Sequence, residues 1–270
     1  MHAPLADLAL AQRLERCEGK TNAAFVRARA RLSPESGAGS IECAGAYALF
    51  DGVGSPLTQT FCLGIFAAPS AADLDTLETF FADRGAEAFH EVSPLAGMET
   101  AGLLASRGYR PIEFTSLMYR ALSPAFEESR TSIATRIATP AEADLWSRTA
   151  AEGWSEHEES ATFMLDVGRV SIASEGMTAF LAELEGRPVA TGALAIHDGV
   201  ALLAGASTIP SQRNQGAQRA LLEARLRYAA QLGCDLAMMG ASPGSASQRN
   251  AERQGFRIAY TRVKWGQPAP

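Results

Sequence analysis

Residues 210–233, PSQRNQGAQRALLEARLRYAAQLG, lie between a predicted strand and a predicted helix, and this junction decides how the rest of the chain is interpreted. The apolar run GVALLAGASTI directly before it predicts a buried strand. From about Gly216 onward, the i, i+4 spacing of Leu222 and Leu226 predicts a helix with one apolar face. The polar segment 212–218 therefore lies at the N-terminus of a helix that follows a strand.

This polar turn has the features of an anion site. The first N–H groups of a helix have no partner within the helix, and the helix dipole is positive at this end, so phosphate is stabilised there. Gly216 has no Cβ and lets a ligand approach the main chain, and Arg213 and Arg219 can add charge-assisted hydrogen bonds. The alternative is that Gly216 only starts a helix and both arginines are solvated. The turn is not a P-loop, because it lacks GxxxxGK(S/T).

The composition restricts the class of protein. The chain has 270 residues and a net charge of -6, which suits two domains and argues against a general nucleic-acid-binding protein. Its four cysteines are scattered, so neither a zinc site nor a disulfide framework is expected. The chain has no apolar run long enough to span a membrane, and residues 1–17 predict an amphipathic helix instead of a signal peptide. We therefore expect a cytoplasmic protein with no metal, no nucleic-acid partner and no membrane.

The order helix, strand, helix, strand occurs twice. The segments are 70–85, 86–92, 98–107 and 109–122 in the first half, and 216–232, 234–240, 245–253 and 256–265 in the second. The last strands are also similar in sequence, GYRPIEFT against GFRIAYT. We interpret this as a duplication, with domains at 1–122 and 133–270 and a polar linker at 123–132. Chance recurrence of this order in an α/β protein is the alternative.

The second half begins with a strand at TRIATP, then a helix, then a charged loop, EGWSEHEES, at residues 152–160. Three antiparallel strands follow, because Glu185-Gly186 and Asp198-Gly199 are typical hairpin turns. The predicted order of the second half is strand, helix, three antiparallel strands, helix, strand, helix, strand.

This order, together with the turn, resembles the GCN5-related N-acetyltransferases, the GNAT superfamily. Their acyl-CoA signature is (Q/R)-x-x-G-x-(G/A), and Arg213 and Gly216 match it. Gln218 stands where Gly or Ala is usual, and its side chain would crowd a pyrophosphate unless it points away or donates a hydrogen bond itself. The later segment PGSASQRNAERQGF is similar to the end of the family's signature, and the resemblance covers about residues 131–265. It implies an α/β (mixed α+β) fold of two tandem GNAT-like domains, each a mixed, mostly antiparallel central sheet flanked by helices.

The first half resembles a degenerate copy. At the place matching the turn it has GIFAAPSAADL, residues 64–74, without an arginine–glycine pair. Asp73 and Asp75 enter the first helical turn there, and these acids would repel a pyrophosphate. We therefore expect only the second half to bind acetyl-CoA, while the first half shapes the acceptor site.

The resemblance implies an N-acetyltransferase, in which an amine acceptor, a small molecule or a peptide, attacks acetyl-CoA directly in a ternary complex. The strand before the turn would pair with the pantetheine arm, and the helix N-terminus would hold the pyrophosphate. The protein would be a monomer or a homodimer. The residues assigned to acyl-CoA binding are Ala206, Ser207, Thr208, Arg213, Asn214, Gln215, Gly216, Ala217, Gln218, Arg219, Ser247 and Asn250.

The candidate catalytic residues are Glu156, His157 and Tyr260. An acceptor ammonium must lose a proton, and the charged loop with Glu156 and His157 is the best candidate region for a base, although a solvated loop is the ordinary alternative. Tyr260 is a candidate proton donor or a core residue, and His197, beside a hairpin turn, is expected to be exposed. Many family members protonate the leaving thiolate with a tyrosine on the last helix, but the matching residue here is Ala251. This departure leaves a non-catalytic acyl-CoA-binding or regulatory protein as the alternative function.

Overall fold

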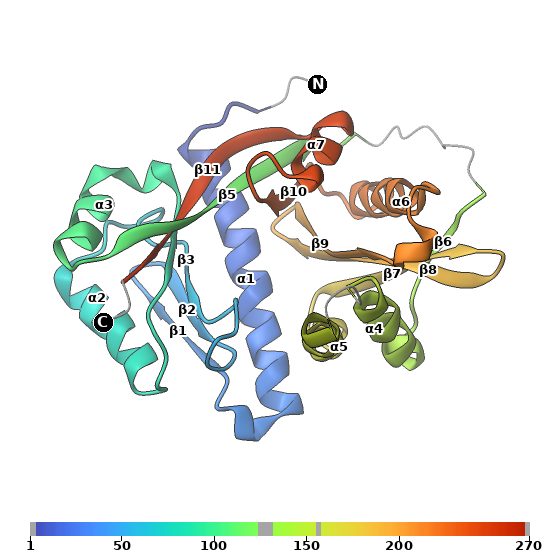
Figure 1. Ribbon diagram of the computed structural model, residues 1–270. Coiled ribbons are helices and arrows are strands. Elements are labelled where there is room, and N and C mark those ends of the chain that lie inside the picture. The colour runs from blue at the N-terminus through green and yellow to red at the C-terminus, as the bar shows by residue number, and fades with distance from the viewer. Residues whose placement is uncertain (1–3, 124–131, 155–157, 268–270) are drawn as a thin grey trace. The chain divides into compact units, whose positions relative to one another are not determined.

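The computed structural model describes residues 4–123, 132–154 and 158–267 (Figure 1). Its contacts divide the chain into two compact units, which we call the central unit, residues 121–237, and the terminal unit, residues 2–120 with 238–270. The predicted boundaries at 1–122, 123–132 and 133–270 separate two copies in the sequence, which is a different division from these compact units. These boundaries stay a prediction. Within the described ranges, no helix has the length and apolar character needed to cross a membrane.

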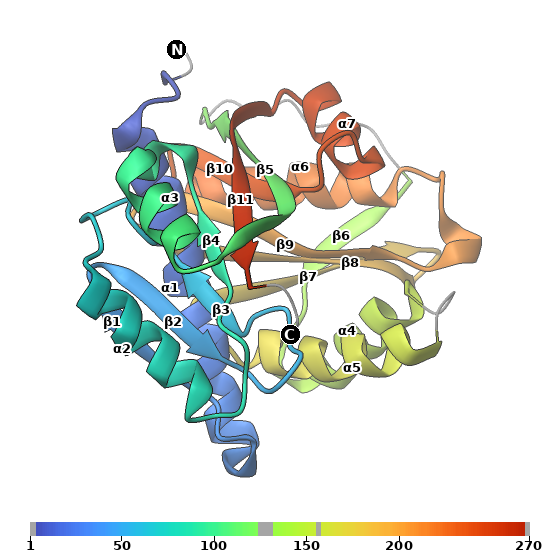
Figure 2. The same cartoon turned by 60° about the vertical axis from the view of Figure 1, so that its left-hand side comes forward.

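The central unit is a four-stranded sheet with helices on both faces. Its elements are β6 (Ala134–Ile137), α4 (Ala143–Glu152), α5 (Glu158–Ile172), β7 (Met177–Leu184), β8 (Arg187–His197), β9 (Val200–Thr208) and α6 (Ala217–Gln231). The strands lie in the order β6-β7-β8-β9, and each pair is antiparallel. In Figure 2, α4 and α5 cover one face of this sheet and α6 covers the other.

Both predicted hairpin turns of the central unit are confirmed. Glu185 and Gly186 join β7 to β8, and Asp198 and Gly199 join β8 to β9. All four residues have φ between 51° and 76°. Two consecutive residues with positive φ form the tight turn whose twist matches that of antiparallel strands.

The predicted order was wrong at one place, because it has a single helix between the first strand and the three antiparallel strands. The structure has two helices there, and α5 begins at Glu158, inside the segment 152–160 that was interpreted as a loop. Acidic residues are favourable in the first turn of a helix, so a charge run before an apolar segment can open a helix as well as form a loop.

Helix α6 confirms the helix predicted after the turn, but its buried face differs from the predicted one. Leu226 is buried as predicted, whereas Leu222 is only half-buried. The buried face instead passes through Leu221 and Arg225. A buried arginine on this face was not expected from the sequence.

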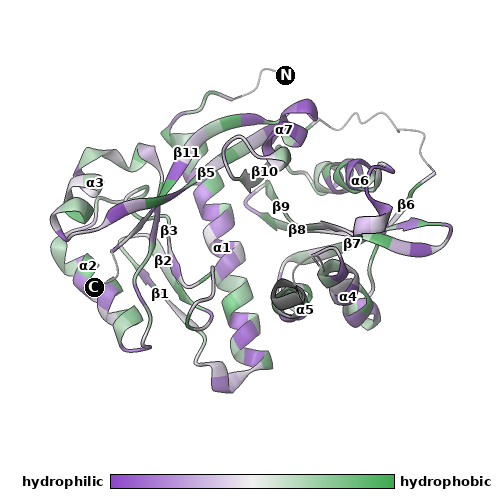
Figure 3. Cartoon of the chain, in the orientation of Figure 1, coloured by the Kyte–Doolittle hydropathy of each residue, from purple (hydrophilic) through white to green (hydrophobic). Residues whose placement is uncertain are grey.

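The terminal unit contains residues from both ends of the chain. Its elements are α1 (Leu8–Leu32), β1 (Gly39–Cys43), β2 (Ala46–Phe50), β3 (Gln59–Phe61), α2 (Ala71–Ala82), β4 (His90–Val92), α3 (Gly97–Ser106), β5 (Arg110–Ala121), β10 (Leu236–Ala241), α7 (Ala246–Arg253) and β11 (Arg257–Gly266). The strand order is β1-β2-β3-β4-β11-β5-β10, with β3 parallel to β4. The predicted N-terminal amphipathic helix is confirmed from Leu8 onward, and Figure 3 shows hydrophilic and hydrophobic residues alternating along α1.

The last strands of the two predicted copies lie next to each other in this sheet. β11 is antiparallel to both β4 and β5, so the final strand of the second copy lies between two strands of the first. β5, the final strand of the first copy, lies in turn between β11 and β10. This exchange explains why residues 238–270 belong to the terminal unit.

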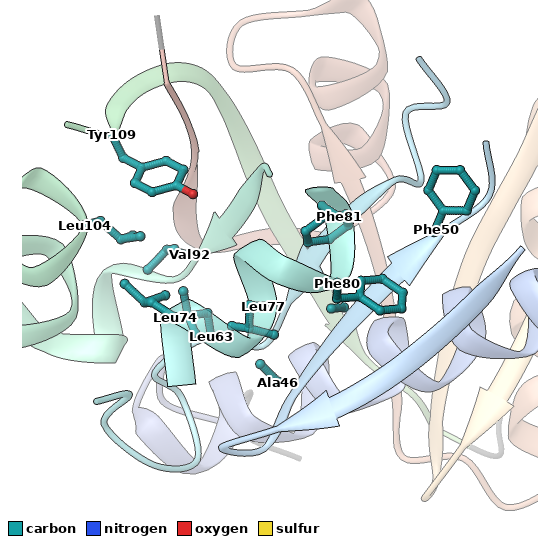
Figure 4. Packing of buried hydrophobic residues seen from close by; sticks show 11 residues of the cluster. Ala46, Phe50, Leu63, Leu74, Leu77, Phe80, Phe81, Val92, Leu104 and Tyr109 are labelled. Carbon is teal, nitrogen blue, oxygen red and sulfur yellow. The ribbon is translucent and has the colours of Figure 1, made fainter. Parts of the chain in front are cut away.

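A buried apolar cluster holds the sheet of the terminal unit to α2 and α3 (Figure 4). Leu74, Leu77 and Phe81 have the i, i+3, i+7 spacing of one helix face of α2, and all three are fully buried. Leu104 of α3 and Tyr109 close the cluster. Burial of side chains of this size typically contributes about 1.5–3 kcal/mol each.

Candidate functional site

The end of β9 carries a β-bulge. Thr191 and Ala193 of β8 pair with Ser207 and Ala204 of β9, so β9 has one extra residue between the pairs. Gly205 lies in this interval with φ of +59°, the left-handed conformation that glycine adopts most easily. The first four residues of β9 are buried, but Gly205 is exposed. The strand therefore opens toward solvent at the bulge.

Beyond the bulge, the main-chain groups of β9 alternate between the side that faces β8 and the opposite side. The N–H of Ile209 donates to the carbonyl of Val189, at 3.0 Å, so Ile209 faces β8. Successive residues of a strand direct these groups to opposite sides. The main-chain groups of Ala206 and Thr208 therefore point away from β8, and Ala206 is exposed.

The turn after β9 leads into a helix N-terminus without a side-chain cap. Asn214 and Gly216 both have left-handed backbone, with φ of +64° and +88°, and Gly216 is the N-cap of α6. The first helical hydrogen bond runs from the N–H of Ala220 to the carbonyl of Gly216, at 3.0 Å. The N–H groups of Ala217 and Gln218 thus have no acceptor within α6. A Cβ on Gly216 would have no described heavy atom within 4 Å, so the main chain is open to a ligand here.

Gln218, the departure from the family signature, does not cover this N-terminus. Its Nε2 donates to the carbonyl of Ser207, at 2.7 Å, and to Oγ1 of Thr208, at 2.8 Å. The side chain therefore points back to the end of β9 and ties the first turn of α6 to that strand.

The end of α4 is held against the same part of β9. Oγ of Ser207 donates to the carbonyl of Ala150, at 2.8 Å. Gly153, the C-cap of α4, lies so close that a Cβ on it would overlap the Ser207 hydroxyl. The carbonyl of Gly153 accepts a hydrogen bond from Nη2 of Arg213, at 3.2 Å. Helix α4, the end of β9 and the turn thus form one connected group.

The charge at this N-terminus is positive. The first turn of α6 contains no acidic residue. Arg219 is mostly exposed, and its Nε lies 2.9 Å from Oε1 of Glu223, one helical turn further on. Together with the helix dipole, Arg213 and Arg219 make this end of α6 suitable for an anion.

The matching place in the first half is closed. At the start of α2, the carboxylate of Asp73 accepts the N–H of Ser70 at 2.8 Å, while the N–H of Asp73 donates to Oγ of Ser70 at 3.2 Å. The hydroxyl and the N–H of Ser70 bind this carboxylate and lower the pKa of Asp73. The strand before α2 is also paired, since the N–H of Thr60 donates to the carbonyl of Phe89 at 2.8 Å. This helix N-terminus therefore uses its own carboxylate as the anion.

The predicted residues of the last helix lie in the terminal unit. Ser247 and Asn250 are exposed on α7, and Oδ1 of Asn250 accepts a hydrogen bond from Nη1 of Arg253, at 3.1 Å. Ser245, and not Ser247, caps α7. Ala251, where many family members have a tyrosine, is buried.

Tyr260 is also in the terminal unit, buried on β11. Its hydroxyl donates to Oε1 of Glu15, at 2.9 Å. Burial is the main cause that raises the pKa of Tyr260 well above its usual value. Burial also raises the pKa of Glu15 to about 7, although Arg262 opposes this shift. The structure thus places Tyr260 in a buried polar cluster, and its role in proton transfer stays a prediction.

The other candidates for proton transfer are Glu156, His157 and His197. Glu156 and His157 lie outside the described residues. His197, at the end of β8, is half-buried and not exposed as predicted, because its ring lies against Gly176. The described residues contain no group of three or more His, Cys, Asp or Glu side chains that could hold a metal ion.

Comparison with protein families identifies this arrangement. The model of the acetyltransferase (GNAT) family matches residues 140–256, which include the bulged strand, the turn and α6. Residues 140–256 thus form a GNAT acetyltransferase segment of the chain. Family and fold together support acyl transfer as the general type of reaction.

Solved structures of GNAT proteins share the fold over most of the chain. A GCN5-related N-acetyltransferase from Kribbella flavida is 22% identical, with 92% of this chain and 96% of that chain covered and a TM-score of 0.65. A tandem GNAT protein from the clavulanic acid biosynthesis pathway is 13% identical, with 83% and 79% covered and a TM-score of 0.58. The tandem GNAT fold predicted from the sequence is thus confirmed. The comparison with curated proteins gave no match.

Two glycines of this candidate site were missed by the sequence reasoning. Gly205 was part of an apolar run, although a glycine inside a strand often marks a bulge. Gly153 was part of a charged loop, and its close contact with Ser207 is a tertiary feature that no local pattern indicates.

Proposed function

We propose that this protein is an N-acetyltransferase that moves an acetyl group from acetyl-CoA to an amine acceptor. The observation that carries the proposal is the open N-terminus of α6, directly after the bulged end of β9. These two features would supply main-chain donors for a pyrophosphate and main-chain groups directed away from β8 for a pantetheine arm. The open N-terminus is a property of this helix, since that of α2 is closed by the capping box of Ser70 and Asp73.

The site would hold the donor in two parts. The N–H groups from Gln215 to Arg219 would bind the pyrophosphate, and Arg213 and Arg219 would add charge-assisted hydrogen bonds. Ala206 and Thr208, whose main-chain groups face away from β8, would pair with the amide groups of the arm. Main-chain N–H groups at the bulge would polarise the thioester carbonyl, in the manner of an oxyanion hole.

The reaction would be a direct displacement in a ternary complex. The amine nitrogen attacks the carbonyl carbon of the thioester, a C–N bond forms, and the C–S bond breaks. The proton of the amine passes to a base, for which Glu156 and His157 are the candidates, and the CoA thiolate takes a proton from water. Tyr260 is the other candidate for proton transfer, but it would have to leave Glu15 first. Proximity and orientation of the two reactants supply most of the rate in such a mechanism.

The acceptor is proposed only as a class. The acidic segment around Glu156 favours a cationic amine, carried by a small molecule or a peptide. We also propose that the protein is cytoplasmic and that it is a monomer or a homodimer.

Thermal unfolding with and without acetyl-CoA, free CoA and ATP tests the proposal. A ligand that binds the native state raises its stability with increasing concentration, by about 2.7 kcal/mol at 100 times its dissociation constant. We expect a clear shift with acetyl-CoA and CoA and little shift with ATP. Absence of a shift at millimolar acetyl-CoA would contradict the site.

The alternative function, an acyl-CoA-binding protein without catalysis, rests on Ala251. If acetyl-CoA stabilises the protein but no amine in a broad panel releases its thiol, this alternative is favoured over the acetyltransferase.

A further inference from the structure

A buried arginine lies beside the bulge of β9 and has no place in the proposed reaction so far. The side chain of Arg225, from the third turn of α6, is almost fully buried. Its Nη1 donates to the carbonyls of Ala193 and Ala204, both at 3.2 Å, and its Nε donates to Leu221 of its own helix, at 3.2 Å. Ala193 and Ala204 are the paired residues at which the ladder resumes next to the bulge. One guanidinium therefore links both strands at this irregular point.

The surroundings of Arg225 are adapted to this side chain. A Cβ on Gly192 would lie 2.8 Å from the guanidinium carbon, so any larger residue at this point of β8 would displace the Arg225 side chain. A Cβ on Gly205 would lie 3.3 Å from the ring of Trp146, which comes from α4 on the other face of the sheet. The bulge is thus fixed from one face by Arg225 and from the other by Trp146.

The charge of Arg225 has no acidic partner among the described residues. Burial alone lowers the pKa of Arg225 to about 10, so the group is still a cation at neutral pH. A buried charge without a counter-ion is costly, and apolar replacements of buried charges are often neutral or stabilising. Stability is therefore a poor reason for an arginine here. The guanidinium binds three carbonyls at once, two through Nη1 and one through Nε, which an apolar side chain cannot do.

We propose that Arg225 is a positioning residue for acyl transfer: it holds the bulge at Gly205 in the shape that directs the main-chain groups of Ala206 toward the thioester. The expected effect on acyl transfer rests on the proposed function, whereas the role of Arg225 in holding the bulge does not. Without Arg225, the carbonyls of Ala193 and Ala204 lose a shared partner, and the bulge can relax toward a regular ladder. The pyrophosphate would still bind, because the turn and the N-terminus of α6 lie two helical turns away.

The test compares Arg225→Met with Leu226→Ala, a neighbouring change that opens the apolar core of the same helix without touching the bulge carbonyls. Hydrogen exchange in the ligand-free protein should be about tenfold faster for the peptide containing Gly205 in Arg225→Met than in Leu226→Ala. With acetyl-CoA and n-butylamine as the probe acceptor, Arg225→Met should lower kcat about 10- to 100-fold, while the dissociation constant of acetyl-CoA changes less than about threefold. Arg225→Lys, which keeps the charge but reaches the two carbonyls less well, should give intermediate values.

Equal exchange in Arg225→Met and Leu226→Ala would overturn the proposal, as would unchanged kcat in Arg225→Met. If Arg225→Met does not fold, Arg225→Lys carries the same comparison. A wild-type protein that binds no acetyl-CoA would refute the proposed function instead, and the exchange measurement, which needs no ligand, would still decide whether Arg225 fixes the bulge.

Discussion

At the scale of single residues, the site depends on where one side chain points and where another is missing. Gly216 leaves the N-terminus of α6 open, and Gln218, which the family signature disfavours, turns away toward Ser207. The sequence predicted the open position from the absence of a Cβ at Gly216. It left open which way Gln218 points, because a glutamine can reach either side of a helix turn.

Gly216→Glu should abolish acetyl-CoA binding, lowering affinity by at least about 100-fold, while the protein still folds. The substitution places bulk and a negative charge where the pyrophosphate would lie, and Coulomb repulsion is strong at such short distances. Isothermal titration with acetyl-CoA measures the effect. Gly216→Ala is the matched control, since it brings the same left-handed backbone strain without the charge. Tight binding by Gly216→Glu would show that the ligand lies elsewhere.

Gln218→Ala restores a residue typical of the family and should leave acetyl-CoA affinity within about threefold. Its side chain bonds to Ser207 and Thr208 and does not cover the N–H groups. The loss of these hydrogen bonds should cost about 1 kcal/mol of stability. Titration and urea unfolding measure the two quantities. A tenfold gain in affinity would mean that the glutamine obstructs the site.

At the scale of elements, the two halves use the same kind of junction differently. Helix α6 begins with an open glycine, whereas α2 begins with the capping box of Ser70 and Asp73. Both helices and the capping box were predictable, because caps and apolar spacing are local properties of the sequence. The burial of Arg225 was not, since it depends on contacts between segments distant in sequence. The bulge at Gly205 and helix α5 have local signals, a glycine inside a strand and acidic residues at a helix start, but each signal also fits another structure.

Ala72→Glu places a carboxylate in the first turn of α2, at the position matching the first turn of α6. We expect acetyl-CoA affinity to change less than about twofold and stability to stay within about 0.5 kcal/mol, because Ala72 is exposed and acids are favourable at this end of a helix. The same titration used for Gly216→Glu measures it. A large loss of acetyl-CoA affinity would show that the acetyl-CoA site lies in the first half of the chain.

At the scale of the whole molecule, buried ionisable groups make stability depend on pH. Glu15 lies within reach of Arg262 and Tyr260, and burial raises its pKa from 4.5 to about 7. The folded protein therefore keeps a proton that the unfolded chain releases. The stability that this group contributes is fully present below about pH 4.5 and is lost as the pH rises to 7.

Glu15→Gln, which imitates the protonated carboxyl, should remove this dependence. Relative to the wild type, its free energy of unfolding should rise by about 3 kcal/mol between pH 4.5 and pH 8. Urea unfolding at several pH values measures the difference. Burial lowers the pKa of His90 to about 3, so this group destabilises the fold as the pH falls below 6.5, but it does so in both proteins and cancels in the comparison. A difference that does not change with pH would mean that Glu15 is ionised in the folded state.

The exchanged strands have a consequence for how the chain folds as it is made. Val263 and Val92 face each other in the sheet of the terminal unit, so the pairing must wait for a segment synthesised long after its partner. Until β11 has left the ribosome, one side of β4 and one side of β5 are unpaired edges, which are prone to join with other chains. Such long-range pairing also slows folding. The nascent protein should therefore depend on chaperones that shield strand edges, and a ribosome stalled before residue 257 should present a first half that aggregates.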